Sequence, residues 1–345
     1  MAYSAIIKPN DYFNTKLYTG NGSSQTTTGL NFQPDFTWIK VRDDTEGHLL
    51  FDKLRGALYR IQSNNTSAST SVASTLTGWT SDGFSLGADN EVNGSGKNYV
   101  GWNWKGNGSG SANTDGSINS TVSASTTSGF SIVKWTGNGS TATIGHGLGK
   151  VPKMIIVKSL ANTTTWMVQH TSLGNAKEIY LNGTNAAGNS TAWNSTTPTS
   201  TVFSVTGGAG DGVNASGDYI AYCFADIKGF SKFGQYFGNG NANGTFIYTG
   251  FKPAFVIVKA SSISNEWNMW DNKRDPINVA DTVLWSNTTN TEAEIEDDYK
   301  IDMLSNGFKA RTADARLNQS GATYIYMAFA EEPLVSTNGN AATAR

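Results

Sequence analysis

The chain has 345 residues, of which only 15% are charged, and its formal net charge is −2. Phosphate binding needs clustered Lys and Arg, and no basic run occurs, so the sequence argues against a nucleic acid partner. No stretch approaches the roughly 20 consecutive apolar residues of a membrane-spanning helix, and the first residues lack the pattern of a signal peptide. We therefore expect neither membrane insertion nor an internal disulfide, since Cys223 is the single cysteine and its apolar strand favours a buried thiol.

Residues 1–13 precede three internal repeats and have no counterpart before the second and third. We interpret this segment as an attachment arm that docks on another subunit or a larger assembly, with an unstructured leader as the alternative. A neighbouring subunit is also expected to hold the polar tail, residues 334–345, so the sequence predicts a homo-oligomer such as a trimer. The candidate attachment residues of the arm are Tyr3, Ile6, Ile7, Tyr12 and Phe13.

Each repeat opens with an aromatic residue and a Gly-Asn-Gly turn, at residues 18–22, 135–139 and 236–240. A proline and a strand ending in lysine follow, in PDFTWIK, PKMIIVK and PAFVIVK. Proline fits the first position of a strand, where it removes no central ladder bond. We interpret the recurring lysine as a residue that closes a strand or shields an edge from unwanted pairing. The three lysines are Lys40, Lys158 and Lys259.

The next block of each repeat is ambiguous when one copy is read alone. Residues 46–62, EGHLLFDKLRGALYRIQ, suit an amphipathic helix. The matching segments place Gly174-Asn175 and Pro276 in the middle, where a helix would break. We therefore predict two strands around a turn in all three copies, followed by a further strand at 83–86, 202–205 and 307–310.

The last block of each repeat is Asn-x-Ser-Gly followed by an alternating aromatic strand, at residues 92–104, 213–224 and 317–329. Asn, Ser and Gly favour a turn before the strand. One face of the strand is large and the other mostly small, as expected where a second layer approaches closely. We predict that the large residues point into the core of each module. They include Trp102, Trp104, Tyr222, Phe224 and Phe329.

Six or seven short strands in about 100 residues is the size of an antiparallel β-sandwich or jelly roll. The predicted fold class is all-β, with three tandem antiparallel β-sandwich (jelly-roll-like) modules related by the internal repeat. We expect a separable first module followed by a rigid pair, because the first joint has a flexible composition and the second is short. The predicted segments are an arm at 1–13, repeat 1 at 14–105, a Gly/Ser linker at 106–117, repeat 2 at 118–228, repeat 3 at 229–333 and a tail at 334–345.

The sequence offers little catalytic or metal chemistry. Three histidines, His48, His146 and His170, are far apart and have no cysteine partners, so they do not match a zinc site. No nucleophile elbow, phosphate-binding loop or metalloprotease motif occurs. The acidic run at 291–298 suits a solvated loop better than a calcium site. We therefore predict no catalytic residues, no cofactor and no metal.

Two kinds of residue leave a functional alternative open. Polysaccharide-cutting enzymes use two carboxylates at a fixed separation, and Asp52 and Asp271 occupy equivalent places, although repeat 2 has Gln169 or His170 there. An exposed tryptophan face beside Asn and Asp would suit a sugar ring, with core packing as the favoured alternative. The candidate glycan-binding residues are Trp166, Trp267, Trp270 and Asp271.

The phrases YTGNG, GFSIVKWTGNG, GHGLGKVPKMIIVKS, YIAYCFADIKGFSKFG and YTGFKPAFVIVK resemble a repeat domain of marine tailed-bacteriophage structural proteins, often labelled tail-fibre-like. The resemblance covers about residues 16–333 and brings no established catalytic or ligand residues. It implies a non-enzymatic virion protein on the particle exterior, a tail fibre or capsid decoration, whose arm attaches to other virion proteins. Host surface polysaccharide is a further candidate partner. The alternatives are a glycan-binding adhesin and a tail polysaccharide depolymerase.

Overall fold

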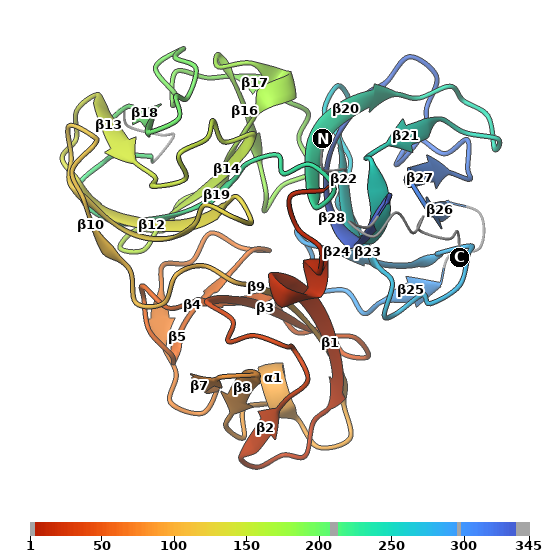
Figure 1. Ribbon diagram of the computed structural model, residues 1–345, viewed down its shortest axis with the longest axis horizontal. Coiled ribbons are helices and arrows are strands. Elements are labelled where there is room, and N and C mark those ends of the chain that lie inside the picture. The colour runs from red at the N-terminus through yellow and green to blue at the C-terminus, as the bar shows by residue number, and fades with distance from the viewer. Residues whose placement is uncertain (1–3, 208–212, 295–297, 336–345) are drawn as a thin grey trace.

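The computed structural model describes residues 4–207, 213–294 and 298–335. Within these residues the regular structure is nearly all β, with one short α-helix and two 3-10 turns. The strands pair into antiparallel sheets, which confirms the all-β prediction. Figure 1 shows three groups of strands around a common centre, each built from one continuous stretch of chain.

The first stretch, residues 9–104, builds a large and a small sheet after a short 3-10 turn. Its elements are η1 (Pro9–Asp11), β1 (Phe13–Thr19), β2 (Gln25–Thr27), β3 (Phe36–Val41), β4 (Leu49–Asp52), β5 (Tyr59–Gln62), β6 (Thr70–Ser71), β7 (Leu76–Thr80), β8 (Gly83–Leu86), α1 (Asn90–Asn93) and β9 (Asn98–Trp104). The large sheet has the order β1-β9-β3-β4-β5-β6, and the small sheet has the order β2-β8-β7. Residues 46–62 thus form two strands around a turn, as predicted.

The second stretch, residues 111–224, repeats this plan with two strands, β10 and β11, added at the start and a small sheet of two strands. Its elements are β10 (Ser111–Asn113), β11 (Ser120–Ser125), β12 (Phe130–Gly137), β13 (Ala142–Gly145), β14 (Met154–Ser159), β15 (Met167–His170), η2 (Thr171–Leu173), β16 (Lys177–Tyr180), β17 (Gly188–Asn189), β18 (Val202–Val205) and β19 (Gly217–Phe224). The large sheet runs β10-β11-β12-β19-β14-β15-β16-β17, and β13 pairs with β18.

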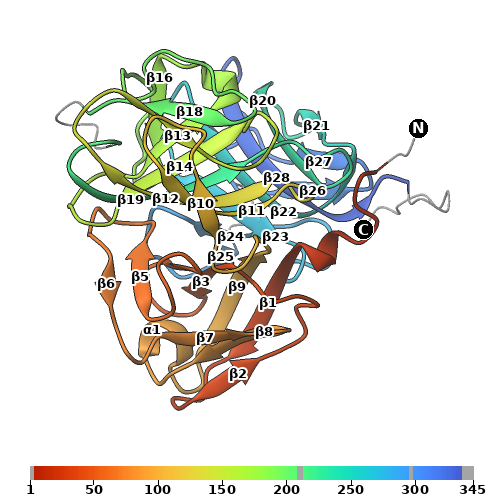
Figure 2. The same ribbon diagram turned by 60° about the vertical axis from the view of Figure 1, so that its left-hand side comes forward.

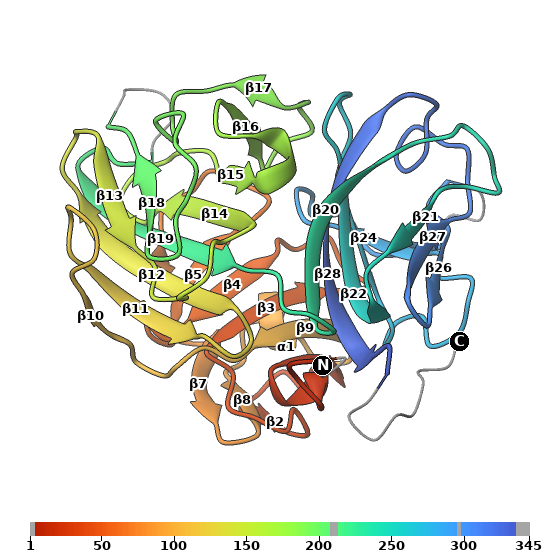
Figure 3. The ribbon, with the colours of Figure 1, turned by 45° about the horizontal axis from the view of Figure 1, so that its top comes forward.

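The third stretch, residues 231–333, again builds a large and a small sheet. Its strands are β20 (Ser231–Phe237), β21 (Phe246–Tyr248), β22 (Phe251–Ala260), β23 (Trp267–Asp271), β24 (Thr282–Trp285), β25 (Ala293–Glu294), β26 (Ile301–Leu304), β27 (Gly307–Ala310) and β28 (Thr323–Pro333). The large sheet runs β20-β28-β22-β23-β24-β25, and the small sheet runs β21-β27-β26. In Figure 3 the small sheet lies outside the long strands β20, β22 and β28.

In each repeat the small sheet packs against the mostly small face of the large sheet. One phenylalanine from the strand predicted at 83–86, 202–205 and 307–310 makes this contact. Phe84 lies 5.9 Å from Tyr18, Phe203 lies 5.9 Å from Trp135, and Phe308 lies 5.4 Å from Tyr326. Gly101 explains the need for small residues, because a Cβ there would come within 3.4 Å of the Phe84 ring. The predicted close approach of a second layer is confirmed.

The large aromatic residues do not point into the core of their own repeat, and this corrects the prediction. Trp102, Trp104, Tyr222, Phe224 and Phe329 are all buried in one core that the three large sheets share. The Trp104 ring contacts Phe224 of repeat 2 at 6.3 Å and Phe329 of repeat 3 at 5.6 Å. Because large side chains line one face of each sheet, three such faces bury far more apolar surface together than apart.

The predicted flexible linker is also corrected. Ser111 to Asn113 form β10, which pairs with β11 of the second large sheet. Before it, the backbone N–H of Gly106 donates to Asp35 Oδ2 at 2.8 Å, and that of Asn107 donates to Ser123 Oγ at 2.8 Å. The first repeat is therefore bound to the second along this joint, and Figure 2 shows the strands of repeat 1 below β10 and those of repeat 2 beside and above it.

The ring of repeats closes through equivalent backbone hydrogen bonds. Ser69 donates to the carbonyl of Leu160 at 3.0 Å, Ala187 to that of Ser261 at 2.8 Å, and Glu292 to that of Arg42 at 2.7 Å. These bonds join repeat 1 to 2, repeat 2 to 3, and repeat 3 back to 1. An ion pair between Arg42 and Glu292, at 2.6 Å, adds to the last joint. A separable first module is not compatible with a ring that closes on it.

Candidate functional site

The candidate glycan-binding tryptophans lie inside the joints between repeats. The Nε1 of Trp166 donates to the carbonyl of Gln62 in repeat 1, and that of Trp267 donates to the carbonyl of Tyr180 in repeat 2, each at 2.8 Å. The two acceptors occupy equivalent places in the strand register. Gln62 pairs with Leu49 in repeat 1, and Tyr180 pairs with Met167, which is the equivalent residue of repeat 2. The tryptophans therefore fix one repeat on the previous one.

Trp270 and Asp271 are buried as well, and Trp270 donates to the carbonyl of Tyr299 at 3.0 Å. The sequence expectation of an exposed tryptophan face is thus corrected, since a fully buried indole offers no face to a sugar ring. The favoured alternative, core packing, describes Trp166, Trp267 and Trp270.

His48 takes the place of these tryptophans at the third joint. Its ring faces the backbone of Trp285 in repeat 3 without a hydrogen bond of ordinary geometry at Nε2, and its Nδ1 accepts a hydrogen bond from Trp38 Nε1 at 2.9 Å. Burial lowers the pKa of His48 well below its ordinary value, so the ring is neutral near pH 7. A neutral imidazole can donate and accept at once, which suits this position.

The two candidate carboxylates each form a buried salt bridge with an arginine three residues later. Asp52 meets Arg55 at 2.5 Å, and Asp271 meets Arg274 at 2.6 Å. Each carboxylate also accepts a hydrogen bond from the following member of the ring. Tyr222 Oη of repeat 2 donates to Asp52 at 2.8 Å, and Trp102 Nε1 of repeat 1 donates to Asp271 at 3.1 Å.

Repeat 2 differs at this position in a way that matches its neighbour. Register places His170 where the other repeats have Asp52 and Asp271. Met327, which has no donor, stands in repeat 3 where Trp102 and Tyr222 stand in the others. His170 Nε2 instead lies 3.2 Å from the carbonyl of Tyr326. An aspartate is therefore present where the facing residue of the next repeat is a hydrogen-bond donor, and histidine replaces it where that residue is methionine.

The recurring lysines are buried in the large sheets. They lie on β3, β14 and β22, which are interior strands, so the edge-shielding interpretation is wrong. Each ammonium group donates to the backbone carbonyl of the last residue of its strand, and Lys259 also reaches the carbonyl of Thr184 of repeat 2 at 3.1 Å. Burial lowers the pKa of Lys40 and Lys158 to about 8 and that of Lys259 to about 7.

A buried asparagine that the sequence analysis read only as a turn residue joins the first and last blocks of each repeat. Asn93, Asn214 and Asn318 of the Asn-x-Ser-Gly turns donate from Nδ2 to the Gly-Asn-Gly asparagines, at 2.7 to 3.2 Å. The partners are Asn21, Asn138 and Asn239. Every repeat contains both the Gly-Asn-Gly turn and the Asn-x-Ser-Gly turn, and this joint occurrence could have predicted the bond from the sequence.

The arm residues belong to the body of the protein. Phe13 begins β1, is buried, and stacks 5.1 Å from Phe329. Ile6 is also buried, and Tyr12 packs 6.2 Å from Phe230. Ile7 is exposed, at 57% of its surface, and Tyr3 lies outside the described residues. The boundary of the predicted arm at residue 13 is corrected, because Phe13 is part of the first sheet.

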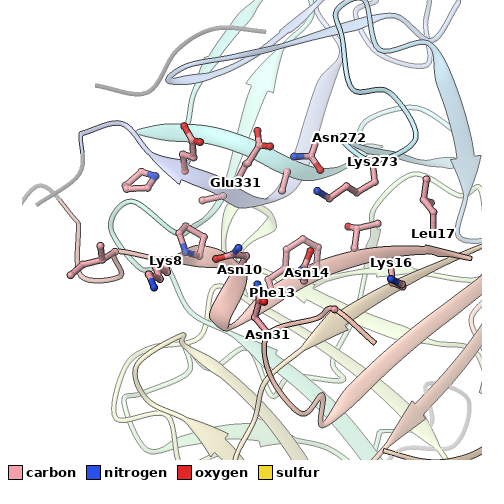
Figure 4. Close-up of a pocket in the computed structure, with 18 residues that line it drawn as sticks. Lys8, Asn10, Phe13, Asn14, Lys16, Leu17, Asn31, Asn272, Lys273 and Glu331 are labelled. Carbon is pink, nitrogen blue, oxygen red and sulfur yellow. The ribbon is translucent and has the colours of Figure 1, made fainter. Parts of the chain in front are cut away.

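Beside the arm lies a surface groove with a volume of about 670 Å³, which we call the arm groove. One wall is the segment from Ile7 to Asn10 and the strand from Phe13 to Leu17. The other wall comes from repeat 3, and Figure 4 shows Asn272, Lys273 and Glu331 across the groove from β1. Since β1 is the edge strand of its sheet, its outer side faces this space.

A second surface feature distinguishes repeat 3. Phe237, Phe246 and Tyr248 are exposed by 60%, 43% and 58%. Register aligns Phe246 with Thr26 and Thr143, since their partners are Lys309, Ser85 and Ser204. Tyr248 likewise aligns with Thr28 and Gly145, and Phe237 with Thr19 and Thr136. We call these three residues the aromatic edge, because Phe237 ends β20 and the other two lie on β21, and both are edge strands of their sheets.

Two further searches of the described residues bear on function. They contain no group of three or more His, Cys, Asp or Glu side chains suited to a metal ion. In the same part of the chain, none of the helices has the length and apolarity needed to cross a membrane.

Fold and sites together define a closed all-β protein of three sequence-related parts with surface grooves. The family model described as "Domain of unknown function (DUF7483)" matches residues 8–333, so the chain belongs to this family. One model thus spans all three repeats and begins inside the arm. No curated protein and no solved structure matches the chain.

Proposed function

We propose that this protein is a non-enzymatic structural component on the exterior of a tailed-bacteriophage particle, a tail fibre or a capsid decoration. Its three sheet pairs act as β-sandwich, jelly-roll-like modules. The repeated phrases that resemble phage structural proteins motivate the virion setting. The observation that carries the structural role is the closed ring, in which the recurring polar residues bond one repeat to the next.

The chemistry of the ring favours a structural role over a depolymerase. Glycoside hydrolysis needs two carboxyl groups that reach the scissile bond. Asp52 and Asp271 are fully buried, and each is held by an arginine and by a donor from another repeat. If either carboxylate moved away to act on a substrate, its arginine would be left as an uncompensated buried charge, which is strongly destabilising.

The aromatic edge is the surface that best suits contact with another virion protein. Aromatic residues are enriched at protein interfaces, and several exposed apolar side chains close together mark an interaction surface more than single ones do. Tyr248 also lines a pocket with Lys228 and Gly229, and a Cβ on Gly229 would lie 2.5 Å from Ser4 Oγ. Tyr248 of the aromatic edge therefore lies close to the segment that packs against the start of the arm.

The experiment is to label this protein in intact particles with specific antibody and gold, and to image them by electron microscopy. Label on tails or on the capsid surface is the expected result. Label absent from purified, infectious particles would overturn the virion role. In parallel, incubation with host surface polysaccharide tests the depolymerase alternative, because shortening of the polysaccharide would show an enzyme. Binding without shortening would favour the adhesin alternative, for which the arm groove is the candidate site.

A further inference from the structure

The arm groove gathers lysines that form no hydrogen bond or ion pair within the described residues, although the charge of Lys16 also acts on Asp82. Lys8, Lys16 and Lys273 line it, and none of their ammonium groups is hydrogen-bonded or ion-paired with any residue that the structure describes. Most other lysines do have such a contact, as Lys232 does with Asp226 at 2.8 Å. Unpaired cations that line one cavity favour an anionic ligand.

The acidic residues on the rim do not cancel this charge. Glu331 is ion-paired with Lys252 at 3.4 Å, so Glu332 is the remaining negative group among the lining residues. With the neighbouring Lys252 and Asp82 counted, four lysines stand against three carboxylates, those of Glu331, Glu332 and Asp82. A continuous polyanion such as nucleic acid would meet both glutamates, whereas a chain with spaced negative groups can avoid them.

The remaining polar groups suit hydroxyls. Asn10, Asn14, Asn31 and Asn272 line the groove, and an amide side chain both donates and accepts. Figure 4 shows the labelled lysines spread along the groove from Lys8 at one end to Lys16 at the other. The volume of about 670 Å³ lies in the range, roughly 300–1,000 Å³, of sites that hold small ligands.

We propose that the arm groove binds a linear acidic oligosaccharide, with Lys16 and Lys273 contacting its carboxylate or sulfate groups and the amides contacting its hydroxyls. A lysine is a compact point charge that suits a single anionic group on a flexible chain. The ligand lies along the free edge of β1, between repeats 1 and 3. The inference goes beyond the virion role, because groove binding does not depend on where the protein is located.

The test is binding of an alginate oligosaccharide to the full chain, measured by calorimetry at low and at moderate salt. A neutral malto-oligosaccharide of equal length is the comparison ligand. We expect alginate to bind, malto-oligosaccharide to bind at least about tenfold more weakly, and added salt to weaken alginate binding. The double variant Lys16→Ala/Lys273→Ala should weaken alginate binding by about tenfold or more.

The matched control is Lys153→Ala/Lys177→Ala, which removes two lysines from outside the groove. This control should change alginate affinity less than about twofold. The proposal is overturned if alginate does not bind, if both double variants weaken it equally, or if the neutral sugar binds as well. Lys16→Arg/Lys273→Arg should restore affinity, and far-ultraviolet circular dichroism checks that every variant is folded. Particle labelling is independent of all these outcomes, so the two proposals can fail separately.

Discussion

Trp102 Nε1 donates a hydrogen bond of 3.1 Å to Oδ2 of Asp271, which lies 169 positions later in the chain. The contact joins repeat 1 to repeat 3, and Tyr222 with Asp52 makes the equivalent contact between repeats 2 and 1. Both carboxylates are fully buried. A polar pair at the same place in two joints fixes how each repeat sits on the next.

Asp52→Asn should destabilise the fold by about 3–5 kcal/mol, because it leaves Arg55, which is ion-paired with no other described residue, as an unpaired buried charge. Denaturant unfolding followed by tryptophan fluorescence measures the change. The control is Asp218→Asn, which breaks the exposed Lys134–Asp218 pair and should cost under about 1 kcal/mol. Equal effects from the two variants would mean that the buried pair does not hold the joint.

The buried lysines predict a rise in stability between about pH 7 and pH 10. Burial lowers the pKa of Lys259 to about 7, against 10.5 for an ordinary lysine. In this window the unfolded chain binds a proton that the folded side chain does not, so the free energy of unfolding rises with pH. Below pH 7 both states are protonated and the rise is absent.

Above pH 10 the trend should reverse, because burial raises the pKa of Tyr236 well above 10 and the unfolded tyrosine ionises first. Urea unfolding at a series of pH values gives the curve. Lys259→Met should reduce the rise between pH 7 and pH 10 without abolishing it, because the pKa values of Lys40 and Lys158 are also lowered, to about 8. An unchanged slope in that variant would show that Lys259 keeps an ordinary pKa in the fold.

The aromatic edge can be converted to the residues of the other repeats. The triple variant Phe237→Thr/Phe246→Thr/Tyr248→Thr should change stability by less than about 2 kcal/mol in total, since all three side chains are exposed. We expect it to reduce incorporation into particles, measured by quantitative immunoblot of purified virions. Tyr59→Thr, at an exposed position in repeat 1, is the control. Normal incorporation of the triple variant would exclude the edge as the docking surface.

Because Phe13 packs in the shared core, we expect substitution of this residue to lower the stability of the fold. The sequence alone suggested an effect on attachment instead. Phe13 stacks on Phe329 and lies 5.5 Å from Phe255, so Phe13→Ala should cost about 3–5 kcal/mol. Ile7→Ala, an exposed position in the same segment, should be within about 0.5 kcal/mol of the parent. Thermal unfolding monitored by circular dichroism compares the two. A neutral Phe13→Ala would restore the idea of an independent arm.

Much of the fold could be predicted because the three copies constrain one another. Pro276 and Gly174-Asn175 excluded a helix at 46–62, and the structure has β4 and β5 there. The alternating large and small residues of β9, β19 and β28 correctly gave two distinct faces. Periodicity reports which side chains share a face, because it follows from backbone geometry alone.

Periodicity does not report what each face packs against. The large face was assigned to the core of its own repeat, but it is buried against the other two repeats. The local sequence around a tryptophan is the same whether the side chain packs in a core shared by three repeats or in the core of its own repeat. The same limit applies to Trp166 and Trp267, whose partners Gln62 and Tyr180 lie in a different repeat. Only position 170 gave a sequence signal for a contact between repeats. The aspartate of the other repeats is replaced there by His170, and the facing residue in repeat 3 is Met327.

Differential scanning calorimetry of the intact chain tests most directly whether the three repeats form one closed body. Trp104, Phe224 and Phe329 share one core, and the joint between Arg42 and Glu292 ties the third repeat to the first. We predict a single transition, with a calorimetric enthalpy equal to the van't Hoff enthalpy for all 345 residues. Two resolved transitions, with repeat 1 melting apart from repeats 2 and 3, would contradict the closed ring.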